Sequence, residues 1–345
     1  MEKAGQFCFT HPSGKDIYLY SLHNANGTEV LITNYGAIIM AYKISMPDKT
    51  VNDIVLGFEN VHDYLNADYL KTYPFMGAAV GRYANRIKNA SFQIDDKDFF
   101  VSKNWGNDQL HGGFDGFDKK VWDFVSFNEE SNILQLKYNS PDGEEGFPGN
   151  LEVNICFELN DDNDLIYEYT ATSDQPTAVN LTHHGYFNLN NGEGTIGEHE
   201  VKIYSDRILE QDEGLVTTGN YIFAADTKYD FREFHAINER VNGGYDQSFV
   251  VDKNDTQLSI VAEVQSKKTG LKLQVLTSEP LVHLYTGQGF PKIRGKYNTE
   301  YGPFSGLCLE TQKHPNAINI SKFPNTVLRP GEKYFQKNVY KIVEL

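Results

Sequence analysis

The chain has 345 residues, of which 40% are hydrophobic and 23% charged, a balance typical of folded globular proteins rather than disordered or fibrous ones. Its 31 Lys and Arg against 47 Asp and Glu give a net charge of −16, which repels nucleic acids and anionic membrane surfaces, so we expect neither as a partner. The opening residues lack the basic start and apolar run of a signal peptide, and no stretch of about 18 apolar residues occurs. We therefore expect a soluble, cytoplasmic protein whose Cys8, Cys156 and Cys308 are reduced core residues.

Alternating apolar and polar residues, typical of half-buried strands, predict most of the secondary structure. Toward the N-terminus, residues 60–70 (NVHDYLNADYL) resemble a helical turn or two, and no longer stretch has convincing helical spacing. Farther along, the alternation predicts strands at residues 134–138, 151–159 and 165–169, and then a hairpin formed by residues 258–264 and 271–275 around a turn at 267–270.

Clusters of Gly, Asn, Asp and Pro separate these short strands at intervals of about 8–12 residues, which indicates an antiparallel sandwich or barrel. The 22 Phe and 21 Tyr residues suit sheet cores and sites that stack on sugar rings. We find no linker, low-complexity tract, shift of composition or internal repeat. The prediction is an all-β fold in which residues 1–345 form a single domain.

Six segments interrupt the strand pattern by placing Arg, His, Asp or Glu among apolar and glycine neighbours. Because buried ionisable groups are costly unless they are paired or functional, these segments need an explanation. They span residues 81–87, 110–122, 180–189, 243–251, 279–287 and 306–319.

The segment NLTHHGYFNL, residues 180–189, contains two adjacent histidines, which could be core residues, half of a metal site or an acid–base group. If the segment is extended, neighbouring side chains point to opposite faces, so His183 and His184 cannot both bind one metal ion or enter one pocket. His184 lies on the more polar face and is the candidate for a site. His183 is expected to pack or hydrogen-bond behind it.

Glu310 lies in SGLCLETQ, where leucines alternate with Cys308 and Glu310. An acid in such a segment is partly desolvated, which raises the pKa of a carboxyl group and makes it a plausible proton acceptor near neutral pH. Together, Glu310 and His184 have the character of an acid–base couple. The sequence alone does not place them in contact.

Seven motifs, read in chain order, resemble the aldose 1-epimerase (galactose mutarotase) family over most of the chain, from about residue 30 to 335. They are NYGA, GRYANRI, LHGG, NLTHHGYFNL, GYDQSF, LYTG and CLETQ followed by PNAIN and FPNTVLRPGE. The resemblance implies a large antiparallel β-supersandwich of the galactose mutarotase type. It further implies interconversion of the α and β anomers of free aldohexoses such as galactose and glucose, without a metal or other cofactor. We expect a small-molecule sugar as the partner and a monomer or homodimer.

The same motifs suggest roles for individual residues. By resemblance, His184 occupies the position of the general acid and Glu310 that of the general base. The family's sugar-contacting positions fall on Asn85, Arg86, His111 and Asp246, with Tyr186 beside the acid.

Two histidines depart from the family pattern. His183 stands where the family commonly has Asn, and His283 stands where it commonly has Gln. A neutral imidazole keeps one donor and one acceptor but differs from an amide in reach and becomes cationic when protonated. We expect His283 to line the pocket and the sugar preference to be affected.

Three other functions compete with this interpretation. A non-catalytic sugar-binding protein on the same scaffold would not need the acid–base pair. A glycoside hydrolase would need two carboxylates about 5–10 Å apart, for which Asp246 and Glu310 are the candidates. A phosphosugar epimerase would need a cluster of Lys and Arg, which the sequence does not show.

Overall fold

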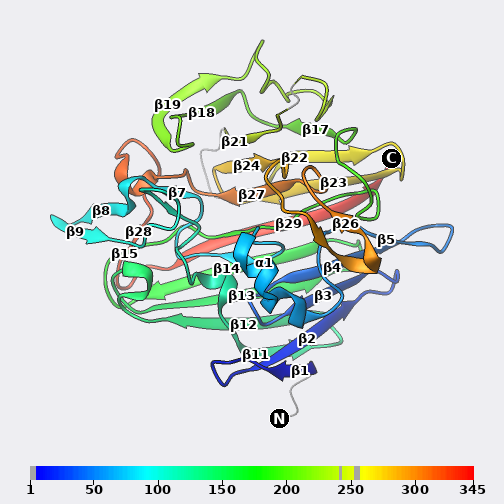
Figure 1. Cartoon of the computed structure of the whole chain (residues 1–345), viewed down its shortest axis with the longest axis horizontal. Coiled ribbons are helices and arrows are strands. Elements are labelled where there is room, and N and C mark those ends of the chain that lie inside the picture. The colour runs from blue at the N-terminus through cyan, green and yellow to red at the C-terminus, as the bar shows by residue number, and fades with distance from the viewer. Residues whose placement is uncertain (1–4, 241–242, 252–256) are drawn as a thin grey trace.

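The structure is a computed structural model that describes residues 5–240, 243–251 and 257–345. Its largest sheet contains nine antiparallel strands and crosses the middle of the molecule (Figure 1). In spatial order these are β11 (Asp123–Asn128), β12 (Ile133–Ser140), β13 (Leu151–Leu159), β14 (Leu165–Ser173), β29 (Tyr334–Glu344), β23 (Leu271–Thr277), β22 (Ser259–Ser266), β17 (Glu200–Ile203) and β20 (His235–Ala236).

Two five-stranded antiparallel sheets accompany the large one. The first follows the chain in order through β1 (Gln6–Thr10), β2 (Asp16–His23), β3 (Glu29–Thr33), β4 (Ile39–Ser45) and β5 (Val51–Asp53). The second has the spatial order β19 (Thr217–Phe223), β18 (Arg207–Gln211), β21 (Asp246–Val250), β24 (Leu281–Tyr285) and β27 (Cys308–Gln312). We call this second sheet the site sheet, because the candidate site lies on one of its faces.

Short elements complete the described chain. The two-stranded pairs are β6 (Ala79–Val80) with β16 (Thr182–His183), β7 (Arg86–Ile87) with β10 (Gln109–Leu110), β8 (Ser91–Ile94) with β9 (Lys97–Phe100), β15 (Thr177–Ala178) with β28 (Val327–Leu328), and β25 (Ile293–Arg294) with β26 (Glu300–Tyr301). The 3₁₀ turns are η1 (Val61–Leu65), η2 (Lys88–Ala90), η3 (Phe117–Lys119), η4 (Glu144–Gly146), η5 (Lys296–Asn298) and η6 (Ala317–Asn319).

One continuous apolar core joins the three large sheets. The large sheet contributes residues such as Val153 and Leu273, the first five-stranded sheet contributes Tyr20, and the site sheet contributes Phe249 and Leu284, all fully or almost fully buried. Because side chains alternate along a strand, the residues between these core positions point to the opposite face. On the site sheet, that opposite face is available for polar groups.

The predicted strands and helical turn are confirmed. Strand β13 alternates between buried and more exposed positions over its whole length, and β22 and β23 form the predicted hairpin. The predicted helical turns correspond to η1 and α1 (Ala67–Thr72), which lies in front of the sheets in Figure 1. Among the described residues, no helix has the length and apolar character needed to cross a membrane.

The prediction that all three cysteines are core residues is partly wrong. All three thiols are free, and Cys308 is buried. Cys8 and Cys156 are only partly buried, because Cys156 belongs to the polar face of β13, away from the core. An apolar neighbourhood in sequence therefore does not bury a residue whose place in the alternation points outward.

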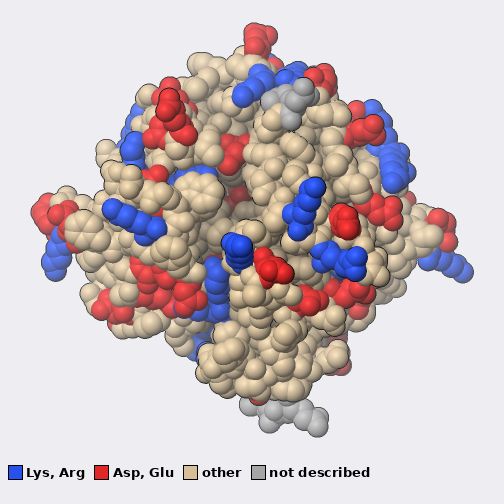
Figure 2. Space-filling view, in the orientation of Figure 1, with Lys and Arg blue, Asp and Glu red and all other residues tan. Residues whose placement is uncertain are grey.

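Charges of both signs are interspersed over the face of the molecule drawn in Figure 2. Acidic side chains outnumber basic ones in the whole chain, in keeping with the net charge of −16. On this face, the described Lys and Arg residues do not gather into one continuous basic field of the kind that binds a polyanion.

Candidate active site

A cavity of about 230 Å³ brings together residues from eight separate parts of the chain. All eight site residues expected from the sequence line it: Asn85, Arg86, His111, His184, Tyr186, Asp246, His283 and Glu310. The remaining lining residues are Thr72, Tyr73, Pro74, Phe75, Trp105, Leu110, Leu215, Tyr285 and Gly289. The cavity is therefore mostly apolar and aromatic, with a small set of convergent polar groups, as small-molecule sites usually are.

Strands β21, β24 and β27 supply one wall of the pocket in two rungs of directly paired residues. Ser248, His283 and Glu310 face one another across the three strands. Two residues along, Asp246, Tyr285 and Cys308 form the second rung. Because residues two apart share a face, both rungs point away from the core and toward the pocket.

His184 and Glu310 approach each other closely at this wall. The distance from His184 Nε2 to Glu310 Oε1 is 3.6 Å, and both side chains are almost completely buried. Burial lowers the pKa of His184, and the nearby charge of Glu310 raises it in part, so the net shift is downward. On the other side of the ring, Nδ1 lies 3.4 Å from the Cys308 thiol, whose own pKa is raised by burial.

One oxygen of Glu310 is left unsatisfied. Oε2 is buried and has no hydrogen-bond partner within the part of the chain that the structure describes. A buried carboxylate oxygen without a donor is costly, and binding a proton relieves that cost. The geometry therefore suits Glu310 to accept a proton.

The proton positions of His111 follow from its neighbour Asn85. The Asn85 backbone N–H donates to His111 Nδ1 over 3.2 Å, and the His111 backbone N–H donates to the Asn85 carbonyl over 3.0 Å. Burial, reinforced by the charges of His184 and Arg86, lowers the pKa of His111 well below its usual value, so the ring is neutral. With Nδ1 accepting, the proton of the neutral ring is on Nε2.

This tautomer bears on the metal alternative. His111, His184 and Glu310 have ligand atoms that lie within 4.8 Å of one another. However, a nitrogen that carries a proton has no lone pair for a metal ion, and the other nitrogen of His111 already accepts from Asn85. The three residues therefore fit a metal ion poorly in this arrangement.

Asp246 is held from two sides. Its Oδ1 lies 2.9 Å from His283 Nε2, and its Oδ2 lies 3.9 Å from Arg86 Nη2. Burial alone would raise the pKa of Asp246, but the hydrogen bond from His283 and the charge of Arg86 outweigh it, so the net shift is downward. Asp246 is therefore an ionised hydrogen-bond acceptor, not a proton donor, which argues against its use as the general acid of a glycoside hydrolase.

Arg86 is the only Lys or Arg among the described residues that line the cavity. Asn85 Oδ1 accepts from the Arg86 backbone N–H over 2.9 Å, and the guanidinium lies over the Trp105 ring, 5.6 Å from its centroid. A single arginine beside two carboxylates is a poor binding site for a phosphate dianion. The electrostatics of the pocket thus disfavour the phosphosugar alternative.

His183 points away from the pocket, as the alternation predicts. Its Nε2 lies 3.2 Å from the Ala37 carbonyl, and its ring packs against Phe157 and Tyr167 in the core. Burial lowers the pKa of His183 to about 4. The two adjacent histidines therefore occupy different environments, and only His184 reaches the cavity.

Sequence reasoning missed the aromatic lining of the pocket. The Phe75 ring lies 5.8 Å from His184 and 4.8 Å from His111, measured between ring centroids. The backbone brings it there, because Gly77 donates to the His184 carbonyl and His184 donates to the Ala78 carbonyl, both over 2.9 Å. Phe75 follows Pro74 in a connecting segment that shows no alternation of apolar and polar residues. Its aromatic neighbours in the sequence are therefore the only signal that could have identified it as a pocket residue.

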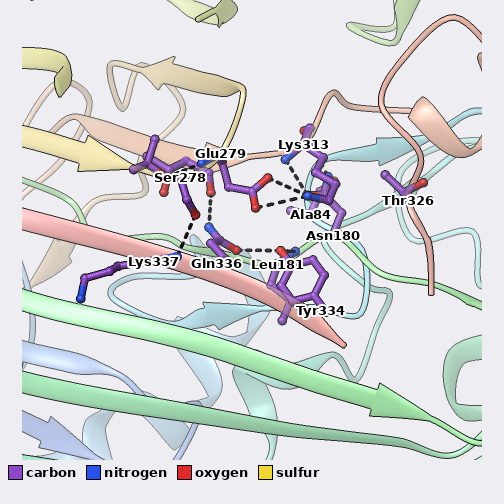
Figure 3. Close-up of polar contacts among 12 residues, drawn as sticks. Ala84, Asn180, Leu181, Ser278, Glu279, Lys313, Thr326, Tyr334, Gln336 and Lys337 are labelled. Carbon is purple, nitrogen blue, oxygen red and sulfur yellow. Dashed lines mark hydrogen bonds and ion pairs between the residues drawn. The ribbon is translucent and has the colours of Figure 1, made fainter. Parts of the chain in front are cut away.

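Asn180 joins the three segments that carry the polar site residues (Figure 3). Its side-chain oxygen accepts from the Lys313 backbone N–H over 2.8 Å. Its side-chain amide donates to the backbone carbonyls of Lys313 and Ala84 over 3.2 and 3.5 Å. Lys313 directly follows the strand of Glu310, and Ala84 precedes the Asn85–Arg86 pair. Asn180 itself begins the segment that leads to His184, so one side chain fixes all three relative to one another.

Further buried polar contacts support the end of β27 (Figure 3). The Lys313 ammonium lies 3.2 and 3.3 Å from the two carboxylate oxygens of the buried Glu279. Gln336 on β29 donates to the Thr311 carbonyl over 2.9 Å and accepts from the Tyr334 hydroxyl over 2.7 Å. These contacts tie the strand of Glu310 to the large sheet and restrict its movement.

Fold and pocket together define an all-β protein with a small-molecule pocket in which buried ionisable side chains converge. Comparison with known proteins agrees: the family model for aldose 1-epimerases matches residues 18–341. Human galactose mutarotase is 37% identical over 316 residues, which is 90% of this chain and 90% of the human protein. The aldose 1-epimerase of Escherichia coli K12 is 32% identical over 342 residues, 96% of this chain and 97% of that protein.

Solved structures show the same likeness. An aldose epimerase homologue from C. elegans has a TM-score of 0.87 at 30% identity, covering 95% of this chain and 99% of that one. A galactose 1-epimerase from Lactobacillus acidophilus has a TM-score of 0.82 at 27% identity, covering 97% and 96%. The chain therefore belongs to the aldose 1-epimerase family, and the predicted family, enzyme class and galactose mutarotase-like fold are confirmed.

Proposed function

We propose that this chain interconverts the α and β anomers of free aldohexoses such as galactose and glucose by opening and closing the sugar ring. The observation that carries the proposal is the pair of buried side chains His184 and Glu310, 3.6 Å apart at the wall of a sugar-sized pocket. The names of the relatives, galactose mutarotase and aldose 1-epimerase, support galactose as a substrate.

Ring opening needs one proton at the ring oxygen and the removal of another from the C1 hydroxyl. In the proposed mechanism Glu310 accepts the hydroxyl proton while His184, as imidazolium, protonates the ring oxygen. The C1–O5 bond breaks, the open-chain aldehyde rotates about C1–C2, and the reversed proton transfers close the ring on the other face. Each positioned proton transfer contributes roughly 10²–10⁴-fold to the rate.

The protonation states in the pocket favour this assignment. Because burial lowers the pKa of His184, its imidazolium is a stronger acid than a histidine in water and gives up its proton readily. The nearby charge of Glu310 raises the pKa of His184 in part and so opposes the effect of burial. A positive charge on His184 and a negative charge on Glu310 therefore stabilise each other.

The other polar groups are proposed to hold the sugar. Neutral His111 donates from Nε2, the ionised Asp246 accepts a hydroxyl hydrogen, and Arg86 with Asn85 supplies further donors. Tyr186 lines the pocket with its ring, since its hydroxyl donates to the Pro74 carbonyl over 3.0 Å. Fixing the ring against the acid–base couple contributes to the rate through orientation.

Polarimetry on freshly dissolved α-galactose and α-glucose tests the proposal. The expected result is a first-order approach to anomeric equilibrium that accelerates with enzyme concentration. A glycosidase assay on nitrophenyl galactosides in parallel should show no release of nitrophenol. Sugar binding without acceleration would instead favour the non-catalytic alternative. That the chain forms one domain, resides in the cytoplasm and acts as a monomer or homodimer stays a prediction.

A further inference from the structure

His283 is a buried residue whose two ring nitrogens are both engaged by protein groups. Nε2 lies 2.9 Å from Asp246 Oδ1, and Nδ1 lies 2.9 Å from the Ser248 hydroxyl oxygen. Because a carboxylate only accepts, Nε2 carries a proton. In the neutral ring, Nδ1 then accepts the Ser248 hydroxyl hydrogen. Neither nitrogen is left to bind a sugar hydroxyl, although the ring lines the pocket.

The strand register explains why these residues meet. Ser248, His283 and Glu310 are direct cross-strand neighbours on β21, β24 and β27, and Asp246 lies two residues before Ser248 on the same face. Cross-strand neighbours on one face are about 5 Å apart, so the imidazole fits between the proposed base and the sugar-binding carboxylate. The arrangement depends on a histidine at 283 and a hydroxyl at 248 together.

We propose that His283 is a positioning residue that acts through Asp246, with Ser248 fixing the imidazole ring. The His283 imidazole occupies Oδ1 of Asp246 and thereby directs Oδ2 toward one hydroxyl of the bound sugar. Oδ2 lies 3.9 Å from Nη2 of Arg86. Without the imidazole, the carboxylate can turn and close the ion pair with Arg86, which removes the acceptor from the sugar. This inference rests on the proposed function of the pocket and assigns part of its substrate recognition.

A consequence for specificity follows from the chemistry of a carboxylate. Asp246 offers acceptors only, so the sugar must present a hydroxyl donor to it. A site built to bond a hydroxyl discriminates strongly against an analogue that lacks it, because the buried polar group is left unpaired. The site therefore selects free aldoses with an unmodified hydroxyl at that position, and an anionic substituent there is repelled.

The test compares equilibrium binding with turnover. The dissociation constant of galactose is measured by calorimetry for wild type, His283→Ala, His283→Gln and Ser248→Ala, alongside kcat and KM from polarimetry. We expect His283→Ala to weaken binding and raise KM about 10- to 100-fold with little change in kcat, the scale of a lost hydrogen bond to a charged group. His283→Gln should restore most of the binding, because its amide N–H can still reach Asp246.

Matched controls separate positioning from loss of structure. Ser266→Ala removes a buried hydroxyl on β22 that bonds Asn190 Oδ1 over 2.6 Å, outside the pocket, and should leave galactose binding unchanged. Ser248→Ala should weaken binding several-fold. Folding of His283→Ala is judged by circular dichroism and thermal melting. If this variant does not fold, the inference is tested by whether Ser248→Ala weakens galactose binding while Ser266→Ala leaves it unchanged.

A double-mutant cycle decides whether His283 acts through Asp246. In an Asp246→Ala background, His283→Ala should have no further effect on the dissociation constant. An equal loss in both backgrounds would mean that the imidazole contacts the sugar directly and would overturn the inference, as would unchanged binding in His283→Ala. Because binding is measured without turnover, a wild type that binds galactose but fails to accelerate mutarotation would refute the proposed function separately.

Discussion

Nε2 of His184 and Oε1 of Glu310 lie 3.6 Å apart, which is close enough for strong electrostatic coupling and too far for a hydrogen bond. A tight hydrogen bond between the two would commit the acid to the base. At the observed separation, both groups remain available to a ligand in the pocket, while each charge still stabilises the other. This spacing suits the proposed exchange of protons with a sugar rather than between the two groups.

The coupling predicts a change in the pKa of His184 when Glu310 loses its charge. Burial already lowers that pKa, and the Glu310 carboxylate opposes the shift. Glu310→Gln should therefore lower the pKa of His184 further, so that less imidazolium is present at any given pH. NMR titration of the imidazole in wild type and variant measures this directly. An upward shift in the variant would show that the carboxylate does not interact with the ring as described.

A second prediction concerns stability in acid and rests on His183. Its pKa is 6.5 in the unfolded chain and about 4 in the folded protein, so between these values the unfolded state binds the extra proton. Stability should therefore fall as the pH drops from 6.5 toward 4, by up to about 3 kcal/mol from this group. His183→Asn should flatten that part of the profile in urea unfolding experiments. An unchanged slope would mean that another group causes the loss.

Asn180 is predicted to matter for both stability and rate. Asn180→Ala leaves the Lys313 N–H without its acceptor, which costs about 1–3 kcal/mol. It also releases the segments of Glu310 and His184 from each other, so kcat should fall. Asn24→Ala provides the control, because Asn24 is also buried and bonds the Asn160 carbonyl and Asn163 in a distant turn. A similar loss of kcat in the control would show that stability, not alignment, is responsible.

The tautomer of His111 predicts that catalysis does not need a metal ion. Its Nδ1 accepts a hydrogen bond from the Asn85 backbone N–H, so the proton of the neutral ring is on Nε2. Neither ring nitrogen then has a lone pair free to bind a metal ion. Dialysis against a strong chelator, verified by elemental analysis, should leave the polarimetric rate unchanged. Loss of activity that zinc restores would contradict this account of the three convergent residues.

Several features could be predicted from the sequence because they depend on local alternation. The opposite directions of His183 and His184 follow from the geometry of an extended segment, and the family motifs locate the polar lining of the pocket. The partial exposure of Cys156 follows the same rule, because its place in the alternation of β13 puts it on the outer face. Local pattern thus identifies which side chains are available to a site.

The remaining features depend on contacts between distant segments. Phe75 reaches His184 only because Gly77 and Ala78 pair with the histidine backbone, and Asn180 joins three segments through one amide. The bond between His283 and Ser248 requires the register of β21 and β24. None of these relationships leaves a periodic signal in the sequence, since each is set by tertiary packing.

The most direct test of the central claim is the polarimetric rate of His184→Gln and Glu310→Gln on α-galactose, with galactose binding and thermal melting measured on the same preparations. We predict that each variant stays folded, binds galactose and loses roughly 10²–10⁴-fold in kcat. A folded variant that retains wild-type turnover would contradict the assignment of these two residues as the acid–base pair.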